Sequence, residues 1–321
     1  MQLSREHLLA AYRTMRTIRE FEERVHAEFA SGDIPGFVHL YAGEEASAVG
    51  VCMNLDDRDK IASTHRGHGH CIAKGCDVDG MMAEIYGRAD GLCGGKGGSM
   101  HIADLSRGMM GANGIVGGGP PLICGAALTA KTLKTGGVAV AFIGDGASNQ
   151  GTTMEALNLA KAWMLPAIFV VEDNGYAEST ASNWSVSGTQ AGRAAGFGIP
   201  SIEANGHDFF DVHQAGSEAI ERARDGGGPT LIHVVVNRYF GHFEGDASTY
   251  RGAGEVEALR RDRDCLDAFR RRVTEAGLLE PGQLDELDRE VAGEIEHSVV
   301  RAKAAAMPTI QTLATDVYVS Y

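Results

Sequence analysis

The stretch Val138-Ala-Val-Ala-Phe-Ile-Gly-Asp-Gly-Ala-Ser-Asn-Gln-Gly151 decides the fold of this chain. Its first six residues form an unbroken apolar run that ends at glycine, as is typical of a strand buried on both faces of a parallel sheet. The residues from about Gly151 to Met164 favour a helix, and the apolar run at 167–171 favours a second strand. Strand, helix and strand at this spacing predict a βαβ unit.

The flanking segments extend this unit into a larger α/β fold. Apolar side chains recur every three or four residues from Ser4 to about Phe29, which predicts one amphipathic helix with Ser4 as its N-cap. Residues 231–236 form another apolar run and predict a further strand. Residues 87–121 are rich in glycine and lack periodicity, so we expect a long loop there, and long loops in compact domains are usually functional.

We expect the whole chain, residues 1–321, to form one domain with a doubly wound, mainly parallel sheet. Residues from about 255 to 307 are charged and predict a helical C-terminal annex, and residues 308–321 predict an extended tail. No internal repeat or low-complexity linker divides the sequence.

The charge of the chain limits its partners. A net charge of −14 argues against binding to nucleic acid or to anionic membranes, because both are negatively charged and attract basic protein surfaces. The sequence has no run of about 18 apolar residues, and its start lacks a basic-then-apolar signal, so we expect a cytoplasmic protein. In such an acidic chain, the phosphate groups of a ligand have to be bound by local groups, namely backbone N–H groups or a metal ion.

The turn Gly144-Asp145-Gly146-Ala147 follows the first predicted strand and opens toward a helix. Its glycines let the backbone turn tightly, and N–H groups at a helix start suit phosphate oxygens. Asp145 is the informative residue, because a carboxylate beside a phosphate group is repelled unless a metal ion bridges the two.

A second motif, Glu172-Asp-Asn-Gly-Tyr176, ends the next predicted strand. Ligands of open parallel sheets bind beyond the carboxyl ends of the strands, where both motifs lie. Mg²⁺ prefers about six oxygen ligands and keeps one or two carboxylates with phosphate and water. The Asp145 carboxylate, the Asn174 amide oxygen and a backbone carbonyl near Tyr176 are therefore the predicted protein ligands.

Further motifs extend this pattern into a resemblance that covers roughly residues 5–300. In order along the chain, the motifs resemble those of the alpha subunits of the thiamin-diphosphate-dependent decarboxylase components of 2-oxo acid dehydrogenase complexes. The segments that carry the resemblance are Tyr41-Ala-Gly-Glu-Glu-Ala46, His65-Arg-Gly-His-Gly69, Gly94-Gly-Lys-Gly-Gly-Ser-Met-His101, Asn113-Gly-Ile-Val116 and Arg238-Tyr-Phe-Gly-His242. Within that family, the stretch before His70 and the tail around Tyr318 look most like acetoin dehydrogenase alpha subunits.

The resemblance implies a set of site residues. Arg66 and His242 are expected to contact the diphosphate of thiamin diphosphate, and Gly114 and Val116 to bind its aminopyrimidine through the backbone. His68 and His242 are the expected catalytic residues, with His68 in proton transfer. The full set of expected cofactor-binding residues is His65, Arg66, Gly114, Val116, Gly144, Asp145, Gly146, Ala147, Asn174 and His242.

The resemblance also implies the reaction and the partners. We expect cleavage of the carbon–carbon bond of acetoin, release of acetaldehyde, and transfer of the acetyl fragment to a lipoyl-bearing acyltransferase component. A beta subunit is expected to supply the activating glutamate, for which this chain has no candidate motif, in an assembly of two alpha and two beta chains. Pyruvate or a branched-chain 2-oxo acid is the alternative substrate.

The chain departs from the family pattern at two positions. His65 stands where pyruvate enzymes usually have Tyr, and Phe243 stands where animal enzymes have a phosphorylatable Ser, so kinase control is not expected there. Two other classes of function stay open at this point: an NAD-dependent oxidoreductase, since an acidic residue also follows the second strand, and a non-catalytic scaffold subunit. A zinc site at His65, His68, His70 and Cys71 is a further alternative.

Overall fold

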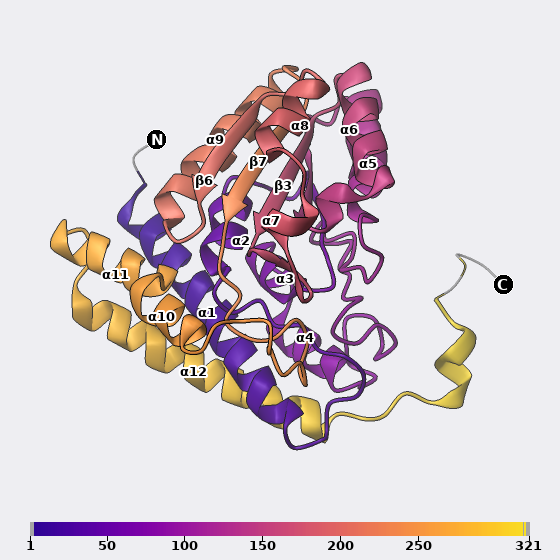
Figure 1. Ribbon diagram of the computed structural model, residues 1–321. Helices are drawn as coiled ribbons and strands as arrows, with labels where there is room; N and C mark the ends of the chain where they lie inside the picture. The colour runs from indigo at the N-terminus through magenta and orange to yellow at the C-terminus, as the bar shows by residue number, and fades with distance from the viewer. Residues whose placement is uncertain (1–2, 317, 319–321) are drawn as a thin grey trace.

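The computed structural model describes residues 3–316 and residue 318. At its centre lies a parallel five-stranded sheet in the order β1-β2-β3-β7-β6 (Figure 1). The strands are β1 (Lys60–Ala62), β2 (Ala139–Gly144), β3 (Ala167–Asp173), β6 (Ser201–Asn205) and β7 (Thr230–Val235). The predicted α/β class with a mainly parallel sheet is confirmed. A separate hairpin consists of β4 (Tyr176–Ala177) and β5 (Thr180–Ala181).

Helices cover both faces of the sheet, which explains why the central strands β2 and β3 consist mainly of buried apolar residues. Alternate residues of β2 point to opposite faces: Ala141 packs into one core cluster and Phe142 into the other. The helices on the Ala141 side are α5 (Gly119–Leu133), α6 (Gly151–Ala162) and α8 (Gln190–Gly196). The helices on the Phe142 side include α1 (Arg5–Phe29), α2 (Glu45–Cys52) and α9 (Phe209–Arg224).

The remaining helices lie at the ends of this layered core. The shorter ones are α3 (His68–Ala73), α4 (Val78–Ile85) and α7 (Ser182–Ser185), with a 3-10 turn, η1, at Ala147–Asn149. The predicted C-terminal helical annex consists of α10 (Glu255–Asp262), α11 (Cys265–Glu275) and α12 (Pro281–Ala304). Helix α12 packs along α1 and α4, as Figure 1 shows at the lower left.

The start of the N-terminal helix agrees with its sequence-based prediction, and the end of the glycine-rich loop differs from it. The N-terminal helix begins at Arg5, and the Ser4 hydroxyl accepts the His7 backbone N–H at 3.2 Å, so the predicted N-cap is confirmed. The loop predicted to end at residue 121 ends earlier, because α5 begins at Gly119 and takes two prolines into its first turn.

The extended tail predicted for residues 308–321 is wrong in part. A 3-10 helix, η2, spans Ile310–Ala314, and the Thr312 hydroxyl donates to the Thr309 carbonyl at 2.8 Å within that turn. Such local hydrogen bonds from Thr side chains favour turns over extended chain. Residues 317 and 319–321 of the predicted tail lie outside the described residues.

The register of the sheet brings the two chemical motifs together. Gly144, the last residue of β2, pairs with Glu172 of the neighbouring β3, so the turn at Asp145 and the segment after Asp173 leave the sheet side by side. In the part of the chain that the structure describes, no helix has both the length and the apolar composition needed to cross a lipid bilayer.

Candidate active site at the carboxyl edge of the sheet

A pocket of about 330 Å³ opens at the carboxyl ends of β2 and β3. The structure brings to its wall every residue that was predicted to bind the cofactor or a metal ion, although the segments that carry them are far apart in the sequence. These residues are His65, Arg66, Gly114, Val116, Gly144, Asp145, Gly146, Ala147, Asn174, Tyr176 and His242. His68, predicted to be catalytic, does not line this pocket.

Asp145 is a buried carboxylate, and one of its oxygen atoms lacks a hydrogen-bond partner among the described residues. Its side chain is 2% exposed, and its Oδ2 atom is buried with no hydrogen-bond partner among the described residues. Burial, with the nearby charge of Asp173, raises the pKa of Asp145 to about 6. A buried charged oxygen without a partner is costly unless a cation or a proton accompanies it, so this atom points to a cation.

Asn174 stands next to this carboxylate on the pocket wall and is held by two hydrogen bonds. The Tyr176 backbone N–H donates to Asn174 Oδ1 at 3.2 Å, and Asn174 Nδ2 donates to Glu44 Oε1 at 3.2 Å. Because the amide nitrogen donates to an oxygen of the Glu44 carboxyl group, the orientation of the amide is fixed and a lone pair of its oxygen stays available. The donor set of carboxylate and amide oxygens fits a hard divalent cation.

Two buried arginines give the pocket a local positive charge. Arg66 donates to the backbone carbonyls of Leu40 and His242, the latter at 2.9 Å. Arg238 donates to the Tyr250 hydroxyl at 2.6 Å, yet its Nε is buried without a partner among the described residues. Burial, with the charge of Arg66, lowers the pKa of Arg238 to about 10, so Arg238 stays charged at neutral pH, as guanidinium groups in proteins do. An acidic chain therefore holds a site for an anion inside this pocket.

Two buried glutamates form the floor of the pocket beside the arginines. Glu172 accepts hydrogen bonds from Ser47 Oγ at 2.6 Å, from the Tyr41 hydroxyl and from His70 Nε2 at 3.1 Å. Burial and the charge of Glu172 raise the pKa of Glu44 to about 8. The neutral form of the Glu44 carboxyl group is therefore favoured more strongly than in a solvent-exposed glutamate.

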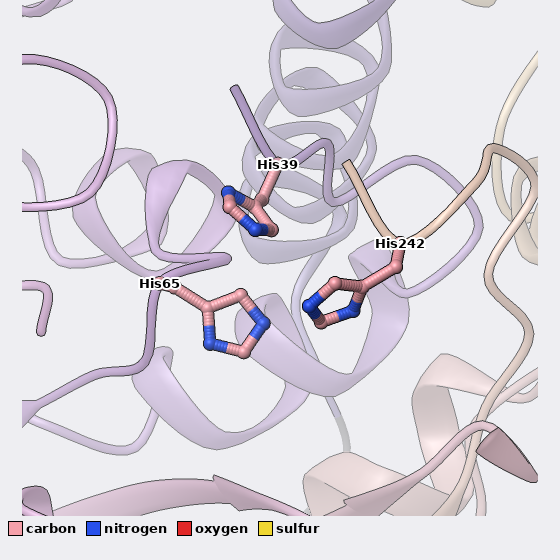
Figure 2. A group of neighbouring side chains, drawn as sticks. All are labelled: His39, His65 and His242. Carbon is pink, nitrogen blue, oxygen red and sulfur yellow. The ribbon is translucent and has the colours of Figure 1, made fainter. Parts of the chain in front are cut away.

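Three histidines from separate segments converge on the same wall, as Figure 2 shows. The ring centroids of His39 and His65 are 4.6 Å apart, and each lies 5.0 Å from the ring of His242. Burial, followed by the charge of Arg66, lowers the pKa of all three, to about 3 for His39, 2 for His65 and 4 for His242. The three imidazoles are therefore uncharged at neutral pH.

His68 lies apart from the pocket, in a buried relay. Its Nδ1 lies 3.0 Å from Glu22 Oε2, and its Nε2 lies 3.0 Å from Ser99 Oγ. Helix α3 begins at His68 and turns its side chain away from the wall that holds His65 and Arg66. With both ring nitrogens engaged and no exposed surface, His68 is placed to hold the structure, and we do not retain it as a catalytic residue.

The alternative zinc site is not assembled either. His70 is engaged by Ser63 Oγ at 2.7 Å and by Glu172, and His68 by the relay described above. Cys71 is buried, and a hydrogen bond with Cys76 together with burial keeps the pKa of its thiol well above its ordinary value. The side chains of His65, His68, His70 and Cys71 therefore do not converge on one point, and of these four only His65 lines the pocket.

The glycine-rich segment, residues 87–118, is pinned by Glu84 of α4. The two oxygens of the Glu84 carboxylate accept four backbone N–H groups of this segment, at 2.7 to 3.1 Å. Their donors are Cys93, Gly95, Gly97 and Gly98. The segment then contributes Met100 and residues 113–117 to the pocket wall, so a buried carboxylate fixes one side of the site.

Arg238, Glu44 and His39 are among the pocket residues that were not assigned a role from the sequence. Arg238 stands four residues before His242 in a quoted motif, and Glu44 stands in another, so the motifs contained a signal for both. His39 belongs to no motif, and nothing local in the sequence marks it. Its position follows from the fold, which places the segment before α2 against the segments that carry His65 and His242.

The sequence matches known proteins along almost its whole length. The Dehydrogenase E1 component family matches residues 13–311. The alpha subunit of acetoin:2,6-dichlorophenolindophenol oxidoreductase of Cupriavidus necator is 61% identical, and the match covers 100% of this chain and 97% of that protein. The subunit of the same name of Bacillus subtilis is 53% identical, with 100% and 96% covered. The alpha subunit of the pyruvate dehydrogenase E1 component of Zymomonas mobilis is 40% identical, with 98% and 89% covered.

Proposed function

The chain belongs to the Dehydrogenase E1 component family, whose members depend on thiamin diphosphate, and from this premise we propose that it is the alpha subunit of an enzyme that cleaves acetoin. The products would be acetaldehyde and an acetyl fragment that passes to a lipoyl acceptor. The ranking of relatives supports this substrate, since proteins named for acetoin are 61% and 53% identical and one named for pyruvate is 40% identical.

The observation that carries the proposal is that the partnerless oxygen of Asp145 lies in the same pocket as two buried arginines. A cation at Asp145 and an anion at the arginines satisfy both sets of groups at once, and a magnesium diphosphate has that charge pattern. Asp145, Asn174 and a backbone carbonyl near Tyr176 would hold Mg²⁺. Arg66 and His242 would hold the diphosphate, and the unassigned Arg238 joins them.

The turn after β2 leaves room for such a ligand. A side chain added at Gly144 would project into open space, so the backbone is accessible there from the pocket. A Cβ at Gly146 would lie 2.6 Å from the Cβ of Ala177, so the turn can pass the hairpin only as glycine. Gly114 and Val116 on the opposite wall would bind the aminopyrimidine through their backbone groups.

Thiamin diphosphate, when bound, supplies the electron sink for carbon–carbon bond cleavage. The protein's own groups bind, orient and handle protons around it. Arg66 and Arg238 would neutralise the anion, and the Glu44 carboxyl group, whose pKa is raised by burial, accepts a hydrogen bond from Asn174. His242 lines the pocket, which supports its proposed catalytic role, and its uncharged ring can donate or accept a hydrogen bond there.

An alpha subunit implies a beta subunit, and one edge of the pocket supports its location. Ile115 and Val116, at the end of the glycine-rich segment, are 72% and 50% exposed. Such an apolar edge is suited to burial by another chain. We propose that the beta subunit covers this edge and supplies the activating glutamate, in a tetramer of two alpha and two beta chains. A cytoplasmic location remains a prediction.

The test uses the co-purified alpha–beta assembly with a dye as electron acceptor. Turnover of acetoin should exceed that of pyruvate and of a branched-chain 2-oxo acid. Thiamin diphosphate with Mg²⁺ should raise the melting temperature of the assembly, and NAD should not. A higher turnover of pyruvate would overturn the substrate, and stabilisation by NAD alone would overturn the cofactor.

A further inference from the structure

Tyr239 lies in the sequence between Arg238 and His242, which are proposed to bind the diphosphate, but it is not among the residues that line the pocket. The residue is 3% exposed, and its backbone N–H donates to the Ala42 carbonyl at 3.1 Å. Its side chain lies among charged groups of the N-terminal helix and of the C-terminal helical annex. Tyr239 therefore connects the cofactor site with the helices behind it.

Two guanidinium groups lie over the aromatic ring of Tyr239. The Cζ atom of Arg19, from α1, is 5.0 Å from the ring centroid, and that of Arg260, from α10, is 4.6 Å from it. A cation over the face of an aromatic ring is attracted to it, and the attraction is stronger where water is excluded. The Tyr239 hydroxyl donates to Asp264 Oδ2, in the N-cap of α11, at 3.3 Å. Contacts from α1, α10 and the start of α11 thus fix this one ring.

Arg19 joins the same group to a second segment of the pocket. Its Nε and Nη2 donate to the two oxygens of Glu45 at 2.6 and 3.0 Å, and its Nη1 donates to Asp264 at 2.7 Å. A bidentate pair of this kind fixes orientation as well as position. The Glu45 carboxylate, which is fully buried at the start of α2, accepts the Gly43 backbone N–H at 2.9 Å. One buried arginine therefore holds both the aromatic ring and the turn that presents Glu44 to the pocket.

The two pocket segments are in direct contact at Gly43. Its φ of +100° lies in the region that favours glycine. A Cβ added there would lie 2.2 Å from the Asn237 carbonyl oxygen and 2.9 Å from Cδ1 of Tyr239. The backbone before Glu44 therefore passes against the backbone before Arg238. Any movement of the Tyr239 ring has to displace these two segments as well.

Arg238 needs such support because few groups hold its own side chain. Its Nη2 donates to the Tyr250 hydroxyl at 2.6 Å and to the Glu178 carbonyl at 3.3 Å, and its Nε has no partner among the described residues. An arginine recognises phosphate oxygens through N–H groups in a fixed planar fork, so its affinity for them depends on where its backbone stands. The buried charges around Tyr239 are not explained by stability alone, since apolar groups of similar volume often stabilise a core equally well.

We propose that Tyr239, held by Arg19, Arg260 and Asp264, is a positioning residue for the diphosphate site. It sets the backbone from which Arg238 reaches the diphosphate, and through it the helical annex acts on cofactor affinity. Tyr239 itself does not touch the cofactor. This inference rests on the proposed function of the chain, because the diphosphate belongs to the proposed cofactor.

The experiment measures the Kd of thiamin diphosphate, with Mg²⁺, for the complete alpha–beta assembly by calorimetry. The melting temperature of the cofactor-free assembly and kcat at saturating cofactor are measured beside it. Tyr239→Leu removes the ring, and Tyr239→Phe removes only the hydroxyl. Arg260→Met removes one cation from the ring at a partly exposed position, and Arg260→Lys keeps a positive charge there.

Two controls isolate the contact between Arg260 and the ring. Arg261→Met removes the neighbouring arginine of α10, which pairs with Asp262 at 2.8 Å. Glu23→Gln removes the ion pair that Arg260 also makes, at 2.8 Å, and leaves the guanidinium over the ring. Both controls should bind the cofactor like the wild-type assembly.

We expect Tyr239→Leu to raise the Kd by about tenfold or more, as when a hydrogen bond to a charged group is weakened. Arg260→Met should raise it by about threefold, since a cation near the surface interacts weakly with a ring. Tyr239→Phe and Arg260→Lys should stay within about twofold, because each keeps the contact between cation and ring. At saturating cofactor, kcat should change by less than about threefold in all four variants, and the melting temperature of Arg260→Met should match that of Arg261→Met.

Three results would overturn the inference. The first is a Kd within about twofold of wild type in both Tyr239→Leu and Arg260→Met. The second is an equal rise in Kd in Arg260→Met and in either control. The third is a fall in kcat as large as the rise in Kd, which would place Tyr239 in the chemistry and not behind it. If Tyr239→Leu does not assemble, the comparison of Arg260→Met with Arg260→Lys and the controls decides in the same way. Failure of the proposed function looks different, because the wild-type assembly itself would then not bind thiamin diphosphate.

Discussion

The carboxylate of Glu84 accepts the backbone N–H of Gly97 at 2.7 Å, and this contact joins helix α4 to the segment that forms one wall of the pocket. Three further N–H groups converge on the same carboxylate. The nearby Ser99 is tied to Glu22 through His68, so two buried carboxylates hold the glycine-rich segment from different sides.

Glu84→Gln should loosen this segment. An amide has one accepting oxygen, so about half of the hydrogen bonds are lost, and each bond to a charged acceptor contributes about 1.5–3 kcal/mol. Hydrogen exchange of the amides at 93–98 should accelerate by at least tenfold, and the apparent affinity for thiamin diphosphate should fall. Glu290→Gln, at an exposed ion pair with Arg13, is the control. Unchanged exchange at 93–98 would show that Glu84 is not needed to hold the segment.

Asp145→Ala should abolish activity while the fold persists, because the proposed cation loses its buried carboxylate ligand and nothing in the core is removed. Activity with acetoin, the circular dichroism spectrum and the thermal shift caused by thiamin diphosphate with Mg²⁺ are the measurements. Full activity of this variant at ordinary Mg²⁺ concentration would eliminate Asp145 as a metal ligand.

The affinity for Mg²⁺ should depend on pH through Asp145. The folded, cofactor-free protein has the pKa of this group raised from 3.8 to about 6, so it still holds a proton at pH 5, where the unfolded chain has lost it. The stability that this group contributes is thus present below about pH 4 and is lost as the pH rises through 6. Cation binding needs the deprotonated form, so affinity should rise about tenfold from pH 5 to pH 7.

Calorimetry of Mg²⁺ and thiamin diphosphate binding in buffers of different ionisation enthalpy measures the released proton directly. Asp173→Asn removes a neighbouring charge that raises the pKa of Asp145, so the midpoint of the pH dependence should move to lower pH in that variant. An identical midpoint in both proteins would assign the pH dependence to another group.

Arg238→Met and His242→Ala should weaken cofactor binding more than they weaken assembly with the beta subunit. A lost hydrogen bond to a charged group of about 1.5–3 kcal/mol corresponds to a loss of affinity of about tenfold to a hundredfold. Arg289→Met, on the exposed side of α12, should bind the cofactor like wild type. If Arg238→Met keeps wild-type affinity, the diphosphate lies elsewhere in the pocket.

His68→Gln separates a structural role from a catalytic one. Since both ring nitrogens are engaged in a buried relay, the variant should lose thermal stability while kcat at saturating cofactor stays within a few-fold of wild type. A fall in kcat of about a hundredfold with unchanged melting temperature would restore the proton-transfer role that the sequence motif suggested.

The sequence predicted best what depends on neighbouring residues. The apolar runs at β2 and β3 and the turn at Asp145 are local patterns. Because parallel strands present ligands at their carboxyl ends, these patterns also predict that Asp145 and Asn174 lie close together, and both line the pocket. His68 was expected at the site from the resemblance of the motif that it shares with His65, and a shared motif does not fix the direction of a side chain. Helix α3 starts at His68, and of the two residues only His65 lines the pocket.

What the sequence could not provide are contacts that only the tertiary fold creates. His39 and His242 are separated by about two hundred residues, and no local pattern links them. The same holds for Glu22 and Ser99, which meet only through His68. Even Glu84, close in sequence to the glycines that it holds, depends on their left-handed or tightly turned backbone, which periodicity does not reveal.

The placement of Arg66 and Arg238 has a consequence for which anions the protein admits. Both guanidinium groups are buried, at 5% and 1% exposure, in a chain with a net charge of −14. A long polyanion meets the acidic exterior first and is repelled before any of its phosphates reaches a guanidinium. A small anion such as a diphosphate can enter the pocket completely, away from the acidic surface of the protein. The burial of these two groups in an acidic chain therefore favours small anions over long polyanions at this site.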